Sequence, residues 1–252
     1  MIEVKNLSCA FSYGMASEQL TAVSSLTVCF QSGKRYAIVG ESGSGKTTLA
    51  RMIAGLQRPS GGSVYVDGNP VYTRSKVGKA HFRKVQLIQQ NSASALDPKM
   101  TVGKSIEEPL ACFLQLDRIE RKKRCEKLME LCKLPQSCYN RLPFELSGGE
   151  QKRVAIARAL AVEPACIIFD EATNGFDLPL RKKIIDEILD LQESLDFTLI
   201  FITHDMELAV VVADEILVMQ NSVLVEHTPF SGDTSVFDHE YSKILLLASG
   251  LT

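Results

Sequence analysis

Eight residues, Gly40 to Thr47, constrain the fold of this chain more than any other segment. They read Gly-Glu-Ser-Gly-Ser-Gly-Lys-Thr and lie between a short apolar run, Arg35 to Val39, and a helix-like segment, Lys46 to Leu56. A glycine-rich turn between a strand and a helix can point backbone N–H groups inward, beside the positive end of the helix dipole. The pattern G-x-x-x-x-G-K-[ST] in this context predicts a phosphate-binding loop in an α/β protein.

This loop predicts the contacts of a nucleoside triphosphate. Lys46 can reach the β- and γ-phosphates, and the hydroxyl of Thr47 can ligate Mg²⁺. The alternative is a chance glycine-rich turn, which the flanking strand and helix disfavour. The residues expected to contact nucleotide here are Gly40, Ser42, Gly43, Ser44, Gly45, Lys46, Thr47 and Thr48.

A second nucleotide motif is the segment Cys166 to Glu171, in which apolar residues end in two acids. Ligands of open α/β sheets bind outside the carboxyl ends of the strands, where these acids would lie. We expect Asp170 to hold Mg²⁺, directly or through water, and Glu171 to polarise an attacking water as general base. The alternative, a strand that ends in a helix-capping acid, is weakened by the phosphate loop upstream.

Strand-like and helix-like segments alternate over most of the chain, which predicts an α/β fold with a mostly parallel core sheet. A hairpin is expected around Asp67-Gly68, with Val71-Tyr72 in its second strand. The other expected strands include Ala22 to Phe30, Arg35 to Val39, Val85 to Gln89, Ala165 to Phe169, Thr198 to Thr203 and Glu215 to Met219. The later helices are expected at Gln151 to Val162, Leu180 to Ser194 and Met206 to Val212.

The middle of the chain differs from this pattern. Thr101 to Leu146 has helical periodicity and few strand signals, which predicts an inserted helical subdomain. Arg118 to Lys127 is highly charged and is expected to be a solvated helix face. Leucines recur three residues apart in this region, which predicts a core stripe made of Leu128, Leu131 and Leu134.

Composition narrows the class of protein. The chain has 252 residues and a formal net charge of -2, which does not suggest a nucleic-acid partner. The seven cysteines form no C-x-x-C pair, so we expect reduced thiols in a cytosolic protein. Met1 to Lys5 lacks a basic region followed by an apolar one, so we expect no signal peptide. No apolar run reaches the roughly 18 residues of a spanning helix, so any transport role needs a membrane partner.

A third motif, Leu146 to Gln151, reads Leu-Ser-Gly-Gly-Glu-Gln before a predicted helix. A serine and two glycines at a helix start make a second possible anion site, although an ordinary N-cap explains them equally well. The segment resembles the signature sequence of ABC ATPases, and it lies between the phosphate loop and the Asp-Glu strand in that family's order. The resemblance covers essentially the whole chain. It implies that Ser147, Gly149 and Glu150 serve an ATP bound by a partner subunit.

The same resemblance implies roles for three more residues. Tyr13 is similar to the aromatic residue that stacks on adenine, with Phe11 as a competitor and a core aromatic as the alternative. Gln90 corresponds to the glutamine that senses Mg²⁺ and water and faces the permease, and it fits the spacing to Ala95-Leu96-Asp97-Pro98 better than Gln89 does. His204, directly after an apolar strand, resembles the switch histidine that contacts the γ-phosphate.

One segment departs from the family pattern. The loop after the catalytic glutamate usually reads Ser-x-Leu-Asp, and here it is Asn174-Gly175-Phe176-Asp177. Asp177 is kept, Asn174 can still form hydrogen bonds, and Phe176 is bulkier than leucine. Because this loop contacts the opposite subunit in the family, the change bears on the geometry and the symmetry of the dimer.

The resemblance implies one ABC ATPase domain over residues 1–252. Residues 1–100 would form an antiparallel β subdomain and the P-loop core, 101–150 the helical subdomain, and 151–252 the rest of the core and the tail. Gln90 to Pro98 and the tail Phe237 to Leu246 resemble the ATPases of dipeptide, oligopeptide and nickel importers, with Glu240 in place of a proline. The cargo implied is a peptide, nickel or a metal chelate.

The implied partners are transmembrane permease subunits, a second ATPase subunit and, indirectly, an extracytoplasmic solute-binding protein. A heterodimer is favoured, and a homodimer is the alternative. The chain would lie at the cytoplasmic face of a bacterial or archaeal membrane, with ATP and Mg²⁺ as cofactors. The competing functions are the ATPase of an ABC exporter and a soluble ABC ATPase of translation or DNA repair. A P-loop kinase or GTPase would lack the element Leu146 to Gln151.

Overall fold

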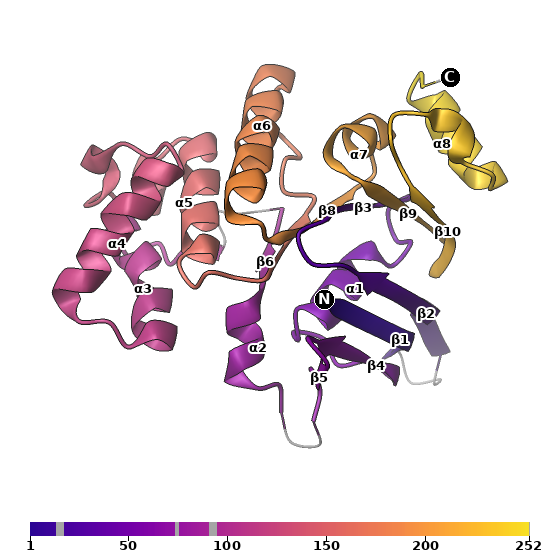
Figure 1. Ribbon diagram of the computed structural model, residues 1–252, viewed down its shortest axis with the longest axis horizontal. Coiled ribbons are helices and arrows are strands. Elements are labelled where there is room, and N and C mark those ends of the chain that lie inside the picture. Colours follow the sequence, from indigo (N-terminus) through magenta and orange to yellow (C-terminus); the bar gives the residue numbers. More distant parts are fainter. Residues whose placement is uncertain (14–17, 74–75, 91–94, 252) are drawn as a thin grey trace.

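The computed structural model describes residues 1–13, 18–73, 76–90 and 95–251, except for the side chains of residues 12, 13 and 18. This part of the chain forms two sheets with helices around them (Figure 1). The larger sheet has six strands in the order β10-β9-β3-β8-β7-β6. Every pair in it is parallel except β10 with β9. Its strands are β3 (Arg35–Val39), β6 (Val85–Ile88), β7 (Cys166–Asp170), β8 (Thr198–Thr203), β9 (Glu215–Gln220) and β10 (Val223–Pro229).

The order of these strands places three sequence motifs at one edge of the sheet. β8 lies between β3 and β7 and runs parallel to both. The phosphate loop follows β3, the Asp-Glu pair ends β7, and His204 follows β8. All residues of β7 and β8 are buried, so the sheet is covered on both faces at these strands.

Two hydrophobic clusters fill the space on the two faces of this sheet. Because side chains alternate along a strand, neighbouring residues of β3 belong to different clusters: Ala37 to one and Ile38 to the other. The cluster with Ile38 also contains the residues of α1 (Lys46–Ile53) and of the smaller sheet. The cluster with Ala37 contains residues of the helices that follow β6. Each face of the sheet therefore packs against a different part of the chain.

The smaller sheet is antiparallel, with the order β2-β1-β4-β5. A turn at Asp67-Gly68, with φ angles of 50° and 73°, joins its last two strands, as the Asp-Gly signal predicts. The second strand of this hairpin begins at Asn69 rather than at the predicted Val71, because Val66 pairs directly with Asn69 across the two-residue turn. The N–H of Val71 still donates to the carbonyl oxygen of Val64 at 2.9 Å, so the pairing continues into the predicted segment. The strands are β1 (Ile2–Tyr13), β2 (Glu18–Phe30), β4 (Gly61–Val66) and β5 (Asn69–Pro70).

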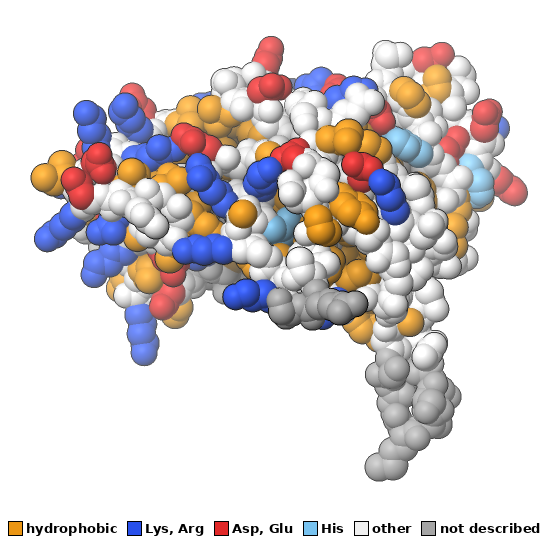
Figure 2. Space-filling model, turned by 60° about the horizontal axis from the view of Figure 1, so that its bottom comes forward, with side chains coloured by type: hydrophobic (Ala, Val, Ile, Leu, Met, Phe, Trp, Pro, Cys, Tyr) orange, Lys and Arg blue, Asp and Glu red, His pale blue; other side chains and the backbone are white. Residues whose placement is uncertain are grey.

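The helical segment gathers on one side of the molecule in Figure 1. Its helices pack on one another through buried residues such as Val102, Ile106 and Met129. Figure 2 shows many Lys and Arg side chains over this side, which confirms the solvated, charged face predicted at 118–127. The helices are α3 (Val102–Leu114), α4 (Arg118–Leu131) and α5 (Gly148–Leu160), with short 3-10 turns at Gln136–Cys138 and Pro143–Glu145.

The core stripe predicted from three leucines is wrong at its centre. Leu128 and Leu134 are buried, whereas Leu131 is 40% exposed. The helix ends at Leu131, and Lys133 has a φ of 54°, so the chain reverses and Leu134 returns to the core. Leu131 therefore stays on the outer side of the last helical turn.

The remaining helices flank the core sheet. Those that follow β7 and β8 agree with the sequence expectation within two residues, whereas β10, α2 and α8 were not predicted. None of the described helices has both the length and the apolar character needed to cross a membrane. They are α2 (Lys79–Lys84), α6 (Leu178–Leu195), α7 (Met206–Val212) and α8 (Glu240–Ala248), with a 3-10 turn at Thr234–Val236 before the last.

Candidate functional site

The glycine-rich loop between β3 and α1 has a backbone that requires glycine at two of its positions. Gly40 has a φ of 148°, and a Cβ atom added there would lie 2.0 Å from the carbonyl oxygen of Met219. Gly45, with a φ of 101°, would place a Cβ atom 2.0 Å from the carbonyl oxygen of Ala22. Neighbouring strands therefore hold the loop in a conformation that no other residue type adopts at these two positions.

The side chain of Lys46 lies inside this loop. Its Nζ atom donates to the carbonyl oxygens of Gly40 and Glu41, both at 2.7 Å, and to the Ser44 hydroxyl at 3.3 Å. The residue is only 4% exposed, and burial lowers the pKa of its ammonium group. A desolvated cation enclosed by a glycine-rich loop interacts strongly with an anion that the loop binds.

Thr47 and Asp170 meet at the start of α1. The Thr47 hydroxyl donates to Oδ1 of Asp170 at 3.0 Å. Asp170 is only 6% exposed, and burial raises the pKa of its carboxyl group. A hydroxyl and a carboxylate are hard oxygen ligands of the kind that Mg²⁺ prefers. This pair of oxygens fits the donor set of a magnesium ion.

A cavity of about 250 Å³ joins these residues to the catalytic candidates. Gln89 and Gln90 both line it, so their position at the cavity does not distinguish which of them is the glutamine that senses Mg²⁺ and water. Arg51, which the sequence reasoning missed, also lines it and lies one helical turn after Thr47, a spacing that could have revealed it. The full lining is Thr47, Arg51, Gln89, Gln90, Asp170 and Glu171.

Glu171 has a strained backbone and two neighbours at its carboxylate. Its φ is 50°, and its N–H donates to the carbonyl oxygen of Ile202 on β8 at 3.0 Å. Nδ2 of Asn174 donates to Oε2 at 3.0 Å. Nδ1 of His204 lies 3.8 Å from Oε1, beyond hydrogen-bond distance, and the His204 side chain is 57% exposed. The strand order thus brings His204 beside Glu171, although 32 residues separate them in the sequence.

The loop that carries His204 is held by an ion pair. Asp205 caps α7 by accepting from the N–H of Leu208. Its other oxygen accepts from Nη2 of Arg181 on α6 at 2.6 Å. Both side chains are largely buried, at 20% and 23% exposure, which strengthens the pair relative to a surface one. The backbone next to His204 is therefore tied to α6, the helix that follows Asp177.

The motif Leu146 to Gln151 starts α5 with a capping box. The Ser147 hydroxyl accepts from the N–H of Glu150, and the Glu150 carboxylate accepts from the Ser147 N–H at 2.8 Å. The N–H and the hydroxyl of Ser147 both donate to the Glu150 carboxylate at 2.8 Å, and these two hydrogen bonds lower the pKa of Glu150. Among the described residues, Ser147, Gly149 and Glu150 do not line the cavity that contains Thr47 and Glu171. The remaining candidate, Tyr13, has a side chain that lies outside the described part of the chain.

A buried lysine that the sequence reasoning missed links α5 to the end of β6. Lys152 is 1% exposed, and its Nζ lies 3.3 Å and 3.5 Å from the carbonyl oxygens of Gln89 and Gln90. Burial lowers its pKa to about 8. Nothing local in the sequence marks this residue, because its partners are main-chain atoms more than sixty residues away.

The pKa of Lys152 predicts a pH dependence of stability. An unfolded lysine keeps its proton to about pH 10.4, so between pH 8 and that value the unfolded chain binds more protons. The free energy of unfolding therefore rises with pH in this window. We expect Lys152→Met to remove about 2 kcal/mol of the rise between pH 7.5 and 9.5, measured by urea unfolding of both proteins. Identical pH dependence in the two proteins would contradict the assignment.

Comparison with known proteins assigns this chain to a family. The family model described as ABC transporter matches residues 23–174. A putative peptide import ATP-binding protein of Brucella abortus (strain 2308) is 38% identical, over 90% of this chain and 69% of the relative. The nickel import ATP-binding protein NikE of Escherichia coli O6:K15:H31 (strain 536 / UPEC) is 33% identical, over 97% of this chain and 92% of the relative.

A solved structure with a similar fold points to the same family as these two relatives. It is the dimeric, post-hydrolysis state of the ATP-binding cassette MJ0796 bound to ADP and Pi. The TM-score is 0.80 at 28% sequence identity, over 92% of this chain and 100% of that chain. The P-loop NTPase fold, with a mostly parallel core sheet, an antiparallel β subdomain and a helical insertion, is thereby confirmed. This chain belongs to the ABC transporter family, among its ATP-hydrolysing subunits.

Proposed function

We propose that this chain is the motor subunit of an ABC importer that takes up a peptide, nickel or a metal chelate through a separate permease. One observation carries the ATPase part: the phosphate loop, the Asp170-Glu171 pair and His204 lie at the ends of three adjacent strands, β3, β7 and β8. The names of two relatives, which describe peptide import and nickel import, support a role in uptake.

Different residues at the site contact different parts of the bound ATP. The backbone N–H groups of Gly43, Gly45 and their neighbours bind the phosphates, and Nζ of Lys46 leaves its carbonyl partners for the β- and γ-phosphates. Mg²⁺ would be held by the oxygens of Thr47 and Asp170, and Gln90 lines the same cavity. When bound, the ion neutralises charge on the phosphate oxygens. Tyr13 is proposed to stack on the adenine ring, and the residues of the loop that contact ATP are Gly40, Ser42, Gly43, Ser44, Gly45, Lys46, Thr47 and Thr48.

Hydrolysis uses two side chains at the ends of β7 and β8. Glu171 accepts a proton from the attacking water, and His204 contacts the γ-phosphate from the neighbouring strand. The 3.8 Å between Nδ1 of His204 and Oε1 of Glu171 places both groups around one small volume. Catalysis then consists mostly of positioning and charge stabilisation, with Lys46 as the fixed cation.

The second half of each site comes from a partner subunit. Ser147 is exposed at the start of α5, and the residues of that motif lie outside the cavity lined by Thr47 and Glu171. Ser147, Gly149 and Glu150 therefore act on the ATP of the opposite subunit. A heterodimer with a second, different ATPase is favoured, because the loop Asn174 to Asp177 departs from the family pattern. A homodimer is the alternative.

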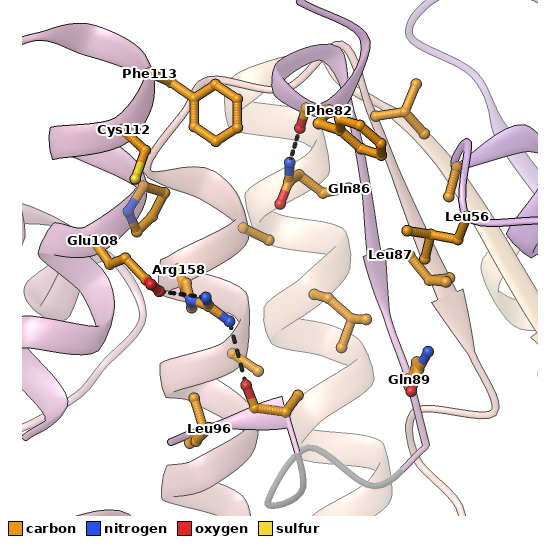
Figure 3. A pocket seen from close by; sticks show the side chains of 17 residues that line it. Leu56, Phe82, Gln86, Leu87, Gln89, Leu96, Glu108, Cys112, Phe113 and Arg158 are labelled. Atoms are coloured by element: carbon orange, nitrogen blue, oxygen red, sulfur yellow. Dashed lines mark hydrogen bonds and ion pairs between the residues drawn. The ribbon is translucent and has the colours of Figure 1, made fainter. Parts of the chain in front are cut away.

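A groove next to the nucleotide cavity fits the coupling helix of a permease. Its volume is about 480 Å³, and it runs between α2 with β6 on one side and α3 with α5 on the other. Figure 3 shows Phe82 and Phe113 at one end and the ion pair of Glu108 with Arg158, 2.5 Å long, further along. Gln89 lines both this groove and the nucleotide cavity, so it is the residue through which a movement at one would reach the other. Such docking places the chain at the cytoplasmic face of the membrane.

Purification of the tagged chain from native membranes tests this function. We expect two multi-spanning permeases and a second ATPase to copurify, and a solute-binding protein to be recovered with them. Leu56→Glu, in the groove at 57% exposure, should reduce recovery of the permeases, because it puts a charge on the docking surface. Ile119→Glu, on α4 at 80% exposure and outside that groove, is the matched control. Recovery of ribosomal or DNA-repair proteins alone would overturn the transport function.

A further inference from the structure

The turn after β7 joins Glu171 and Asn174 by two hydrogen bonds. The N–H of Asn174 donates to the carbonyl oxygen of Glu171 at 3.1 Å, and Nδ2 of Asn174 donates to Oε2 of Glu171 at 3.0 Å. An ionised carboxylate only accepts hydrogen bonds, so the amide must present its NH2 group to it. The backbone bond fixes the separation of the two residues, and the side-chain bond fixes the orientation of the carboxylate.

The two oxygens of Glu171 are therefore not equivalent. Oε2 accepts from Asn174, whereas Oε1 accepts no hydrogen bond from any residue that the structure describes. Oε1 faces Nδ1 of His204 at 3.8 Å, which leaves it without a direct hydrogen bond on that side. Glu171 is 25% exposed and lines the same cavity as Thr47 and Asp170. A water in that cavity would meet Oε1 as an oxygen with free lone pairs.

We propose that Asn174 is a positioning residue that occupies Oε2 and thereby selects Oε1 as the base of the hydrolytic reaction. This inference rests on the proposed role of Glu171. In the step, one proton passes from the attacking water to Oε1 as the water oxygen bonds to the γ-phosphorus. The bond between that phosphorus and the bridging oxygen breaks, and ADP leaves with its electron pair. Asn174 exchanges no proton in this step.

The asparagine is one of the residues by which this loop departs from the pattern Ser-x-Leu-Asp. A serine hydroxyl stands on Cβ, one bond closer to the backbone than the asparagine amide nitrogen, and it has a single hydrogen to donate. The longer amide reaches back over the turn to the carboxylate of Glu171. The departure therefore supplies Glu171 with a hydrogen-bond donor of a different length and geometry.

The loop does not depend on Asn174 for its position. At its start, Glu171 is held to β8 through the carbonyl oxygen of Ile202. At its end, Asp177 caps α6 by accepting from the N–H of Leu180 at 3.0 Å. Between these two points, the partly buried side chain of Phe176 packs against the core. The ring of Phe176 also lies close to Gly148, since a Cβ atom added to that glycine would be 3.3 Å from the ring. Removing the Asn174 amide should therefore release the carboxylate without unfolding the turn.

Steady-state ATP hydrolysis by the transporter complex that copurifies with this chain tests the proposal. In Asn174→Ala we expect kcat to fall roughly tenfold, the equivalent of one hydrogen bond to a charged group, with the KM for ATP unchanged within about twofold. Asn174→Asp keeps the shape but cannot donate, and its charge repels Glu171, so kcat should fall further. Asn174→Ser should lie between wild type and Asn174→Ala. Asn69→Ala, which removes an amide that donates to Asp67 in an exposed turn, is the control.

A second measurement separates orientation of Glu171 from a role in subunit contact. In a Glu171→Gln background, Asn174→Ala should leave the binding of ATP and the amount of ATP-induced dimer unchanged. A loss of dimer there, or a KM that rises as much as kcat falls, would overturn the proposal. An unchanged kcat in Asn174→Ala, with Glu171→Gln inactive, overturns this inference alone. Turnover retained in Glu171→Gln would instead refute the proposed base.

Discussion

Replacing Glu171 by glutamine should lower the rate of ATP hydrolysis by at least about a hundredfold, the range seen for loss of a positioned general base. An amide has nearly the same shape but cannot take the proton of the attacking water. The binding of ATP should persist, because Lys46 and Thr47 are held by other partners: the loop carbonyls and Asp170. Release of phosphate and equilibrium binding of ATP, measured on the same preparation, check both parts.

Glu193→Gln is a suitable control for this experiment. It makes the same chemical change on α6 at an exposed position, away from the residues that line the cavity. We expect it to hydrolyse ATP at the wild-type rate. Turnover in Glu171→Gln within a few fold of wild type would mean that another group accepts the proton, and the fold assignment would stand without this base.

Replacing Lys46 by methionine should weaken the binding of ATP roughly a hundredfold, which corresponds to the loss of one or two hydrogen bonds from a charged donor. Methionine has a similar length and no charge, so the buried space stays filled. The change removes a desolvated ammonium group but also the donor to the carbonyl oxygens of Gly40 and Glu41, so urea unfolding of the variant accompanies the binding measurement. Hydrolysis should fall at least as much as binding, because the same cation faces the γ-phosphate. Isothermal titration with ATP, together with phosphate release at saturating ATP, measures both effects.

The matched control for this prediction is Lys152→Met. Lys46 and Lys152 are both buried lysines that donate to main-chain carbonyl oxygens, but only Lys46 lies in the glycine-rich loop. We expect Lys152→Met to bind ATP within about threefold of wild type. If both variants lost the same affinity for ATP, the loss of any buried lysine near the cavity would explain the effect, and contact of Lys46 with phosphate would not be needed.

Much of the core could be predicted from local patterns. The strands β3 and β8 and the helix α7 have the bounds that their apolar runs predict. The turn at Asp67-Gly68 forms because that dipeptide tolerates positive φ at both residues. Local patterns gave wrong positions where packing sets the position of a residue. The strand after that turn begins at Asn69, two residues before its predicted start, and Leu131 is exposed because α4 ends there.

The elements that were missed have weak local signals. β10 is an edge strand in which most residues are partly exposed, so it lacks the apolar run of a central strand. α8 forms at the end of the chain and packs on the core through Tyr241 and Leu246. The hydroxyl of Tyr241 accepts from the N–H of Glu41 in the glycine-rich loop at 3.1 Å. A contact across 200 residues leaves no trace in the periodicity of either segment.

The sequence by itself determined which chemical groups are present and which local backbone carries them. Gly40 to Thr47 specifies a phosphate loop because its glycines and its strand–helix context are local requirements, and the acids Asp170 and Glu171 end a strand whose apolar run is visible in the chain. Only the tertiary structure decided which of these groups meet. The order β3-β8-β7 brings Glu171 beside His204, and packing of α5 sets Lys152 on the carbonyl oxygens of Gln89 and Gln90. Such meetings depend on strand order and on buried contacts between distant segments, and no window of sequence contains them.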